Sequence, residues 1–327
     1  MDTKEQILGL LERSRGKYLS GEELARSLGL TRAAVWKAVQ ALQREGHIIN
    51  AVPRRGYCLA PGSDVLSVQA ITPFLTHAEY AQNIHIFEVL ESTNKTAKEM
   101  ALDGYGHGTV VIADSQTGGR GRRGRTFHSP PGSGLYISFL LSPEKLCMES
   151  VTWVTALAGV SVCDAAREMT GREPMIKWVN DVFLDGKKIC GILTEALTDV
   201  ESGAIEWLVL GIGVNVTTSF PEELRGVARA LFEDASEIGP GRAPPRARLA
   251  AMLINSILAP ENRIDARTLA QRYKKLQLVL GRDVSVHTSQ GTYSARAVDL
   301  DSSGRLIVQT PDGRVETLYG GEVSVKM

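Results

Sequence analysis

The segment QTGGRGRRGR, residues 116–125, alternates four arginines with four glycines. A short apolar strand pattern precedes it at residues 110–113, and another follows at residues 135–141. Three of its glycines match G-x-G-x-x-G, but a dinucleotide-binding loop must open a helix, and the chain continues instead as TFHSPPG. The absence of G-K-[ST] also excludes a Walker loop. We therefore expect a loop between two strands that wraps and neutralises a phosphate or carboxylate ligand. An RGG-type nucleic-acid patch is the alternative.

Polar residues interrupt a second apolar pattern, MIKWVNDVFL at residues 175–184, which we expect to be one strand followed by an Asp-Gly hairpin turn. An isolated charge in an apolar strand costs several kcal/mol unless it is paired or meets a ligand. Lys177 is therefore a candidate site residue, and a structural pair of Lys177 with Asp181 is the alternative. Strand patterns at residues 189–195 and 208–216 carry glycines that allow backbone or a ligand to approach closely. Asn215 interrupts the second of these and suggests a ligand contact.

The first 63 residues have the pattern of a winged helix-turn-helix. An apolar stripe predicts a helix over residues 4–13, a capping box at residues 20–23 starts a second helix, and Gly29 ends it. Thr31 is the expected cap of a third helix. Two short strand patterns then flank the turn PRRG, residues 53–56, as in a wing. PGSD, residues 61–64, has the composition of a linker.

This segment carries ten Lys and Arg residues against six Asp and Glu residues, although the whole chain has a net charge of zero. Cations and polar groups on the third helix and on the wing can contact DNA phosphates and base edges. The candidates are Arg32, Trp36, Lys37, Gln40, Arg54 and Arg55. The alternative is a three-helix protein-interaction module with a solvated basic face.

The C-terminal residues 281–327 contain four alternating strand patterns around Gly-containing turns, at residues 283–287, 293–298, 305–309 and 315–318. This arrangement predicts a small antiparallel barrel.

Composition limits the class of protein. The 327 residues suffice for two or three domains, and 43% hydrophobic with 23% charged residues excludes disordered, collagen-like and disulfide-scaffold chains. No charge-free stretch reaches the roughly 18 apolar residues of a membrane span, and no secretory signal is visible, so we expect a cytoplasmic protein. The six histidines have no ligand spacing, and neither zinc nor disulfides are indicated for the four cysteines. We expect buried thiols at Cys58, Cys147, Cys163 and Cys190.

Taken together, these motifs resemble the biotin protein ligases, and with the DNA-binding segment they resemble the members that are also biotin operon repressors. The matching segments follow the family's order: ESTN at 91–94, QTGGRGRRGR at 116–125, SP at 129–130, KWVND at 177–181, GILTE at 191–195 and GIGVN at 211–215. Two positions depart from the family pattern. Phe127 replaces the usual Trp. A phenyl ring offers adenine less stacking area than an indole, so nucleotide affinity should be lower. Val179 replaces the usual Pro, for which we expect only a small local shift.

The resemblance implies an α+β protein of three units. These are a winged helix-turn-helix over residues 1–63, a mixed α/β catalytic domain of the biotin/lipoate ligase type over residues 64–274, and an SH3-like β-barrel over residues 275–327.

It further implies a ligase that makes biotinyl-5′-AMP from biotin and Mg-ATP and transfers biotin to a lysine of the biotin carboxyl carrier protein of acetyl-CoA carboxylase. With biotinyl-AMP bound, the chain would form a homodimer on operator DNA and repress biotin genes. By the motif match, Lys177 and Arg122 are catalytic. The biotin site comprises Ser92, Thr93, Asn94, Gln116, Arg120, Gly121, Arg122 and Lys177. The nucleotide site comprises Arg120, Arg122, Phe127, Lys177, Asn180 and Asn215, and Asp181 is the candidate magnesium ligand.

Two rival functions remain at this point. One is a transcription factor whose ligase-like domain only senses a ligand, and the other is a lipoate ligase on a similar fold. Lys177 and the intact arginine–glycine loop favour an enzyme, and the full loop belongs to the biotin branch.

Overall fold

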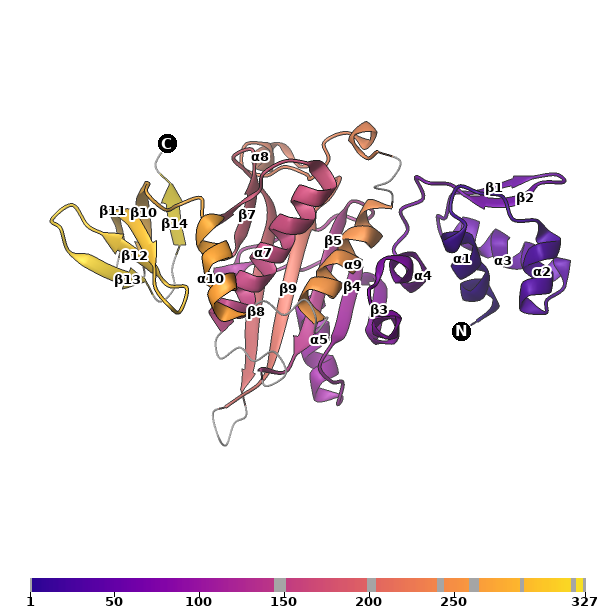
Figure 1. Ribbon diagram of the computed structural model, residues 1–327, viewed down its shortest axis with the longest axis horizontal. Helices are drawn as coiled ribbons and strands as arrows, with labels where there is room; N and C mark the ends of the chain where they lie inside the picture. The colour runs from indigo at the N-terminus through magenta and orange to yellow at the C-terminus, as the bar shows by residue number, and fades with distance from the viewer. Residues whose placement is uncertain are drawn as a thin grey trace.

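Three parts of the chain lie side by side along the long axis of the molecule (Figure 1). The structure is a computed structural model that describes residues 2–143, 151–198, 204–239, 244–258, 265–288, 291–318 and 322–325. A helical part with the amino terminus lies at one end, a large sheet with helices lies in the middle, and a small sheet lies at the other end. The predicted α+β class is confirmed.

The amino-terminal part is a winged helix. It contains α1 (Thr3–Arg13), α2 (Gly21–Leu28) and α3 (Arg32–Arg44), followed by the antiparallel pair β1 (Ile49–Val52) and β2 (Gly56–Leu59). The predicted capping box at Ser20 is present, and the Thr31 hydroxyl accepts from the Ala34 N–H at 3.2 Å. Gly29 is left-handed at φ 64°, so it can end α2 at no steric cost. The apolar faces of the helices close over one core, which includes Ile7, Leu11, Leu24, Val35 and Leu42.

The predicted linker at residues 61–64 is packed against the winged helix. Ser63 is 1% exposed, and its hydroxyl accepts from the Ile48 N–H at 3.0 Å. Arg15 Nη1 donates to the Ser63 carbonyl at 2.7 Å. The short helix α4 (Val68–Ile71) follows and contacts both α1 and α9 (Pro245–Leu258). The winged helix is therefore seated on the central part rather than tethered to it.

The middle of the molecule is a mixed sheet in the order β3-β4-β5-β9-β8-β7-β6. Only the β3–β4 pair is parallel. The strands are β3 (Ile84–Leu90), β4 (Thr109–Gln116), β5 (Gly134–Leu141), β6 (Met175–Lys177), β7 (Asp181–Leu184), β8 (Lys187–Thr198) and β9 (Ile205–Asn215). The helices of this part are α5 (Thr93–Leu102), α7 (Val151–Thr170), α8 (Glu222–Arg225), α9 and α10 (Ala266–Lys275).

The two faces of this sheet have different roles, because successive side chains of a strand point to opposite sides. On one face, residues such as Val110, Ile112 and Leu135 join the main core with α7 and α9, which lie across the sheet in Figure 1. On the other face, Val111, Leu140 and Val209 pack against α5. We call this second side the α5 face.

The prediction of one strand over residues 175–184 was wrong. The segment forms two antiparallel strands, β6 and β7, whose register places Lys177 opposite Asp181. The chain reverses between them at Trp178, Val179 and Asn180, and the Trp178–Val179 peptide bond is cis. The Tyr273 hydroxyl donates to the Val179 carbonyl at 3.0 Å, a contact from α10 that a local pattern does not contain. The predicted Asp185–Gly186 turn is confirmed, with φ 48° and 77°.

The last part is a five-stranded antiparallel sheet in the order β13-β12-β11-β10-β14. Its strands are β10 (Asp283–Thr288), β11 (Gly291–Leu300), β12 (Leu306–Gln309), β13 (Val315–Leu318) and β14 (Glu322–Val325). Four of these were predicted, and β14 was missed. Trp178 Nε1 donates to the Gly304 carbonyl at 3.0 Å and joins this sheet to the turn beside Lys177. Within the ranges given above, no helix is long and apolar enough to span a membrane.

His47 makes the stability of the winged helix depend on pH. It is 5% exposed, and burial lowers its pKa from 6.5 to about 4, an effect that Glu45 opposes and that Arg15 and Lys4 reinforce. The unfolded chain takes up a proton near pH 6.5, whereas the folded chain resists protonation until about pH 4. The free energy of unfolding should therefore fall as the pH falls from about 6.5 towards 4. Urea unfolding at about pH 7 and about pH 5 measures this fall, which should be smaller in His47→Leu. An equally steep fall in that variant would contradict the assignment.

Candidate active site

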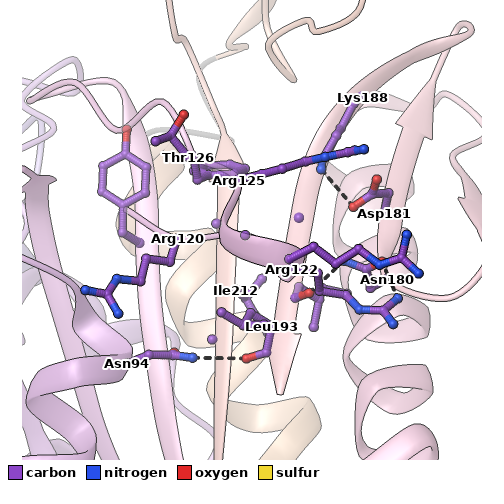
Figure 2. A pocket seen from close by; sticks show the side chains of 18 of the residues that line it. Asn94, Arg120, Arg122, Arg125, Thr126, Asn180, Asp181, Lys188, Leu193 and Ile212 are labelled. Atoms are coloured by element: carbon purple, nitrogen blue, oxygen red, sulfur yellow. Dashed lines mark hydrogen bonds and ion pairs between the residues drawn. The ribbon is translucent and has the colours of Figure 1, made fainter. Parts of the chain in front are cut away.

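A pocket opens on the α5 face, where residues from β5, β7, β8 and β9 meet the arginine–glycine loop (Figure 2). Nearly all of the predicted ligand-binding residues line it: Ser92, Thr93, Asn94, Gln116, Arg120, Gly121, Arg122, Phe127, Lys177, Asn180 and Asp181. The exception is Asn215, which is 3% exposed at the end of β9 and is not among the lining residues. The fold thus brings together side chains that lie up to about ninety positions apart in the sequence.

The floor of the pocket is a row of directly opposed residues on adjacent strands. Across the sheet the partners run from Lys177 to Asp181, Gly191, Gly213 and Tyr136. Opposed residues share a face. The two glycines in the middle leave the backbone bare, while the residues at the ends supply charge and a ring. This arrangement gives a flat floor with a charged wall.

Phe127 lies over that floor. A Cβ on Gly213 would come within 2.7 Å of the ring, and one on Gly191 within 3.2 Å. The ring also meets Tyr136 edge to face, with the centroids 6.4 Å apart. The close approach of the Phe127 ring therefore requires glycine at position 213 and leaves little room for a side chain at position 191, where the sequence alone predicted the approach of backbone or a ligand.

The amino terminus of α5 is held in a buried hydrogen-bond network at one end of the pocket. The backbone N–H of Thr93 donates to Gln116 Oε1 at 2.9 Å, and Gln116 Nε2 donates to Ser129 Oγ at 3.0 Å. Asn94 Nδ2 donates to Glu195 Oε2 at 2.8 Å and to the Leu193 carbonyl at 3.1 Å. These bonds fix the orientation of the amides before any ligand binds.

The arginine–glycine loop spreads its cations over the pocket. It forms no α-helix, as predicted, and contains only the short 3₁₀ turn Arg122–Gly124. Arg122 Nη1 donates to Asn180 Oδ1 at 3.3 Å, whereas Arg120 points the other way in Figure 2 and pairs with Glu91 at 3.1 Å. Arg123 Nη2 reaches the His287 carbonyl of β10 at 3.5 Å. The loop therefore contacts both ends of the pocket and the small sheet.

Lys177 is not paired with Asp181, so that structural alternative was wrong. Asp181 pairs with Lys188 at 2.8 Å, as Figure 2 shows. Lys177 Nζ lies 5.7 Å from the centre of the Phe183 ring, and the part of the chain that the structure describes contains no ion pair for it. Its ammonium group is half-buried at the edge of the glycine floor, where an anion can meet it.

Lys188 is a pocket residue that the sequence reasoning missed. It follows the Asp185–Gly186 turn, where a lysine pair is usually a solvated feature, and only the register of β7 on β8 brings it to Asp181. With it, the lining holds six cations and one carboxylate, Asp181. Such an excess of positive charge, over a bare floor with an aromatic ring, suits a polyphosphate together with a carboxylate.

The donor set for a cation is small. Among the described residues no cluster of three or more His, Cys, Asp or Glu side chains could hold a metal ion. Asp181 alone offers a carboxylate in the pocket lining. Mg²⁺ commonly takes one carboxylate and completes its shell with phosphate and water, so the residues present fit a magnesium ion delivered with a nucleotide.

The remaining predicted residues fall where their motifs placed them. Trp36 is 54% exposed on α3, Arg32, Lys37, Arg54 and Arg55 are exposed, and Gln40 is partly covered. Arg55 lies 4.2 Å over the centre of the Tyr18 ring. Cys58, Cys163 and Cys190 are buried free thiols as predicted, and Cys147 lies outside the described residues.

Sequence profiles of three families match the chain in order. An HTH domain matches residues 3–58, the biotin/lipoate A/B protein ligase family matches residues 86–215, and the biotin protein ligase C-terminal domain matches residues 279–326. The matches cover each of the three parts seen in the fold.

Curated relatives match between two thirds and nearly all of the chain. The bifunctional ligase/repressor BirA of Bacillus subtilis is 31% identical and covers 98% of each chain. The biotin–[acetyl-CoA-carboxylase] ligase of Mycobacterium tuberculosis is 32% identical over 66% of this chain and 78% of its own. Among solved structures, the biotin protein ligase of Aquifex aeolicus in complex with biotin and ATP has a TM-score of 0.58 at 28% identity, over 75% of this chain and 99% of that one.

Substitution of Gly211 tests how closely the side chains of the site are packed. A Cβ there would lie 2.1 Å from Asn94 Oδ1, and Asn94 is held by the network above. Gly211→Ala must displace Asn94, and we expect a loss of about 1–3 kcal/mol in the free energy of unfolding. Gly226→Ala, whose Cβ would meet no atom within 4 Å, is the matched control. Urea unfolding of both variants measures the difference, and equal stability would contradict the geometry.

Proposed function

This chain belongs to the biotin protein ligase family, and we propose that it carries out both activities of the bifunctional members. It joins biotin to AMP at the expense of ATP, transfers the biotin to a lysine of the biotin carboxyl carrier protein of acetyl-CoA carboxylase, and represses biotin genes when biotinyl-5′-AMP is bound. We assign DNA binding to residues 1–63, catalysis to residues 64–274, and the SH3-like unit to residues 275–327. Because it acts on ATP and a carrier protein and binds operator DNA, it works in the cytoplasm.

The observation that carries the ligase activity is the unpaired Lys177 at the end of the glycine floor, beside the arginine–glycine loop. A biotin carboxylate oxygen attacks the α-phosphorus of ATP, the bond to the β-phosphate breaks, and pyrophosphate leaves with the electron pair. Both reactants are anionic, so the protein must align them and neutralise their charge. Lys177 and Arg122 align the biotin carboxylate with the α-phosphate of ATP and neutralise the charge of both.

The α5 end of the pocket receives biotin. Thr93, Asn94 and Gln116 offer fixed hydrogen-bonding groups to the ureido ring, since their own orientations are set by the network with Ser129 and Glu195. Ser92 lines the same end of the pocket and offers its hydroxyl. Arg120, Gly121 and Arg122 close over the biotin carboxylate and the acyl phosphate. A neutral lysine amine of the carrier then attacks the acyl carbon, and AMP leaves.

The part of the pocket above Phe127 and the glycine floor receives the adenosine. Phe127 already lies over Gly191 and Gly213 and offers its face to a purine. Asn180 lies beside Arg122 and contacts the phosphates with it. A contact of Asn215 with the nucleotide stays a prediction, because that side chain is not among the lining residues. Mg²⁺, bound through the phosphates and Asp181, would add neutralising charge.

Pyrophosphate release on mixing the chain with biotin and Mg-ATP tests this function. Release that depends on biotin supports the ligase, whereas no release would leave a ligand-sensing transcription factor. Replacing biotin by lipoate distinguishes the lipoate ligases, and a faster reaction with lipoate would reassign the substrate. The repressor activity adds a second expectation: biotin with ATP should shift the chain from monomer to homodimer in sedimentation.

Lys177→Ala should abolish adenylation without unfolding the protein. Lys177 makes no ion pair with any residue that the structure describes, whereas removal of one charge-stabilising donor commonly lowers the rate by about 100-fold or more. Biotin-dependent pyrophosphate release measures the rate. Lys187→Ala is the matched control, because the Lys187 ammonium donates to the Arg225 carbonyl outside the pocket. Near-normal turnover in Lys177→Ala would refute the assigned role.

Replacing Arg54 and Arg55 by Ala should reduce the salt dependence of DNA binding. If each arginine neutralises one phosphate, the slope of log K against log salt becomes shallower by roughly two. Titration of duplex DNA at several salt concentrations measures the slope. Arg296→Ala with Arg314→Ala removes two exposed cations of the small sheet and should leave the slope unchanged. An unchanged slope in the wing variant would remove the wing from the DNA contact.

A further inference from the structure

Arg246, in the first turn of α9, is an almost fully buried cation that neither the ligase chemistry nor the DNA contact uses. It is 3% exposed and lies between carboxylates from two distant segments. Arg246 Nε donates to Asp64 Oδ2 at 2.8 Å, and Nη1 donates to Asp114 Oδ1 at 2.6 Å. Burying such a group is costly unless its geometry and partners are well satisfied, so its position needs an explanation.

Asp64 leads from Arg246 to the winged helix. Its carbonyl also accepts from Arg246 Nη2, and its side chain accepts from the Arg246 backbone N–H at 3.3 Å. The preceding residue, Ser63, is bonded to Ile48 and to Arg15, and Arg15 pairs with the buried Glu12 of α1 at 2.7 Å. Polar contacts on either side of the Ser63–Asp64 peptide bond therefore connect Arg246 to the DNA-binding unit.

Asp114 leads from Arg246 to the ligand loop. It lies in β4, two positions before Gln116, and its second oxygen accepts from the Gly132 N–H at 3.0 Å. Residues 114 and 132 bracket the whole arginine–glycine segment, and Gln116 is bonded to Ser129 inside the bracket. One carboxylate, that of Asp114, thus joins the two ends of the loop at its base.

We propose that Arg246 is a positioning residue that joins the base of the arginine–glycine loop to the linker of the winged helix. A single buried cation shared by two carboxylates cannot move toward one without weakening its bonds to the other. Ordering of the loop strengthens the contact of Asp114 with Arg246. This fixes the position of Asp64, and with it Ser63 and α1. By thermodynamic reciprocity, fixing the winged helix stabilises the loop in return. The effect of ligand rests on the proposed function, while the link between linker and loop base does not.

The link is tested first without ligand, by hydrogen exchange of the full chain. Asp64→Asn should raise exchange at Gly132 by roughly 5-fold or more, within the range of coupling seen for residues of one polar network. Asp114→Asn should likewise raise exchange at residues 60–64, and exchange in β8 should stay unchanged in both. Asp164→Asn is the control. Asp164 also pairs with arginine, here with Arg167 and Arg272, but it contacts neither the loop nor the linker.

The effects of Asp64→Asn and Asp114→Asn on hydrogen exchange must also be non-additive. The double variant Asp64→Asn with Asp114→Asn should exchange at Gly132 no faster than Asp114→Asn alone, because the path is already cut. Changes confined to each substituted segment, or fully additive changes, would overturn the proposal. If Asp64→Asn does not fold, the Asp114→Asn measurement at residues 60–64 decides.

A second experiment measures biotin binding by calorimetry. Asp64→Asn lies outside the pocket, yet it should weaken biotin binding by about 5-fold relative to Asp164→Asn, at the lower end of allosteric couplings. Unchanged affinity alongside coupled exchange would overturn the functional half of the proposal. A parent chain that binds no biotin would instead refute the proposed ligase function, and the unliganded exchange would still decide the role of Arg246.

Discussion

The bare backbone at the centre of the sheet is the constraint on which the site depends. Gly191 and Gly213 oppose each other on adjacent strands, and Phe127 lies so close above them that a methyl group at Gly213 would collide with it. Glycine in a strand normally weakens it, because it packs nothing and loses more entropy on folding. Here the loss is offset by the surrounding core, since the opposite face of the same strands is buried under α7 and α9. The sheet is stabilised from one side so that the other can stay open.

Electrostatics follow from that geometry. The pocket gathers cations from a loop and from the ends of two strands, and its one carboxylate is paired with Lys188. Concentrating like charges costs stability, and the loop arginines contact Glu91, Asn180 and the His287 carbonyl. An anionic ligand would replace these contacts with stronger ones. The same loop is held at its base by Asp114, so its tip can rearrange while its ends stay fixed.

Local patterns predicted much of this protein, and the failures share a physical cause. Capping residues and apolar stripes located the helices of the winged helix, because caps and periodicity act within a few residues. The reversal after Lys177 was missed because distant partners, Tyr273 and Gly304, hold it. Lys188 was missed because its neighbour Asp181 is set by strand register, and the linker's packing was missed because it depends on Arg15 and Arg246.

The sequence by itself determined the winged helix and the arginine–glycine loop, because motif chemistry and side-chain periodicity are carried by neighbouring positions. The resemblance to the ligase family implied the class of fold and most of the candidate ligand residues. Only the tertiary structure decided that Lys177 has no ion pair among the described residues, that Lys188 belongs to the pocket and that Asn215 does not line it. It alone placed Asp64 and Asp114 on one buried arginine. These outcomes depend on which strands align and which loops meet, and contacts between residues far apart in the chain leave no periodic signal in it.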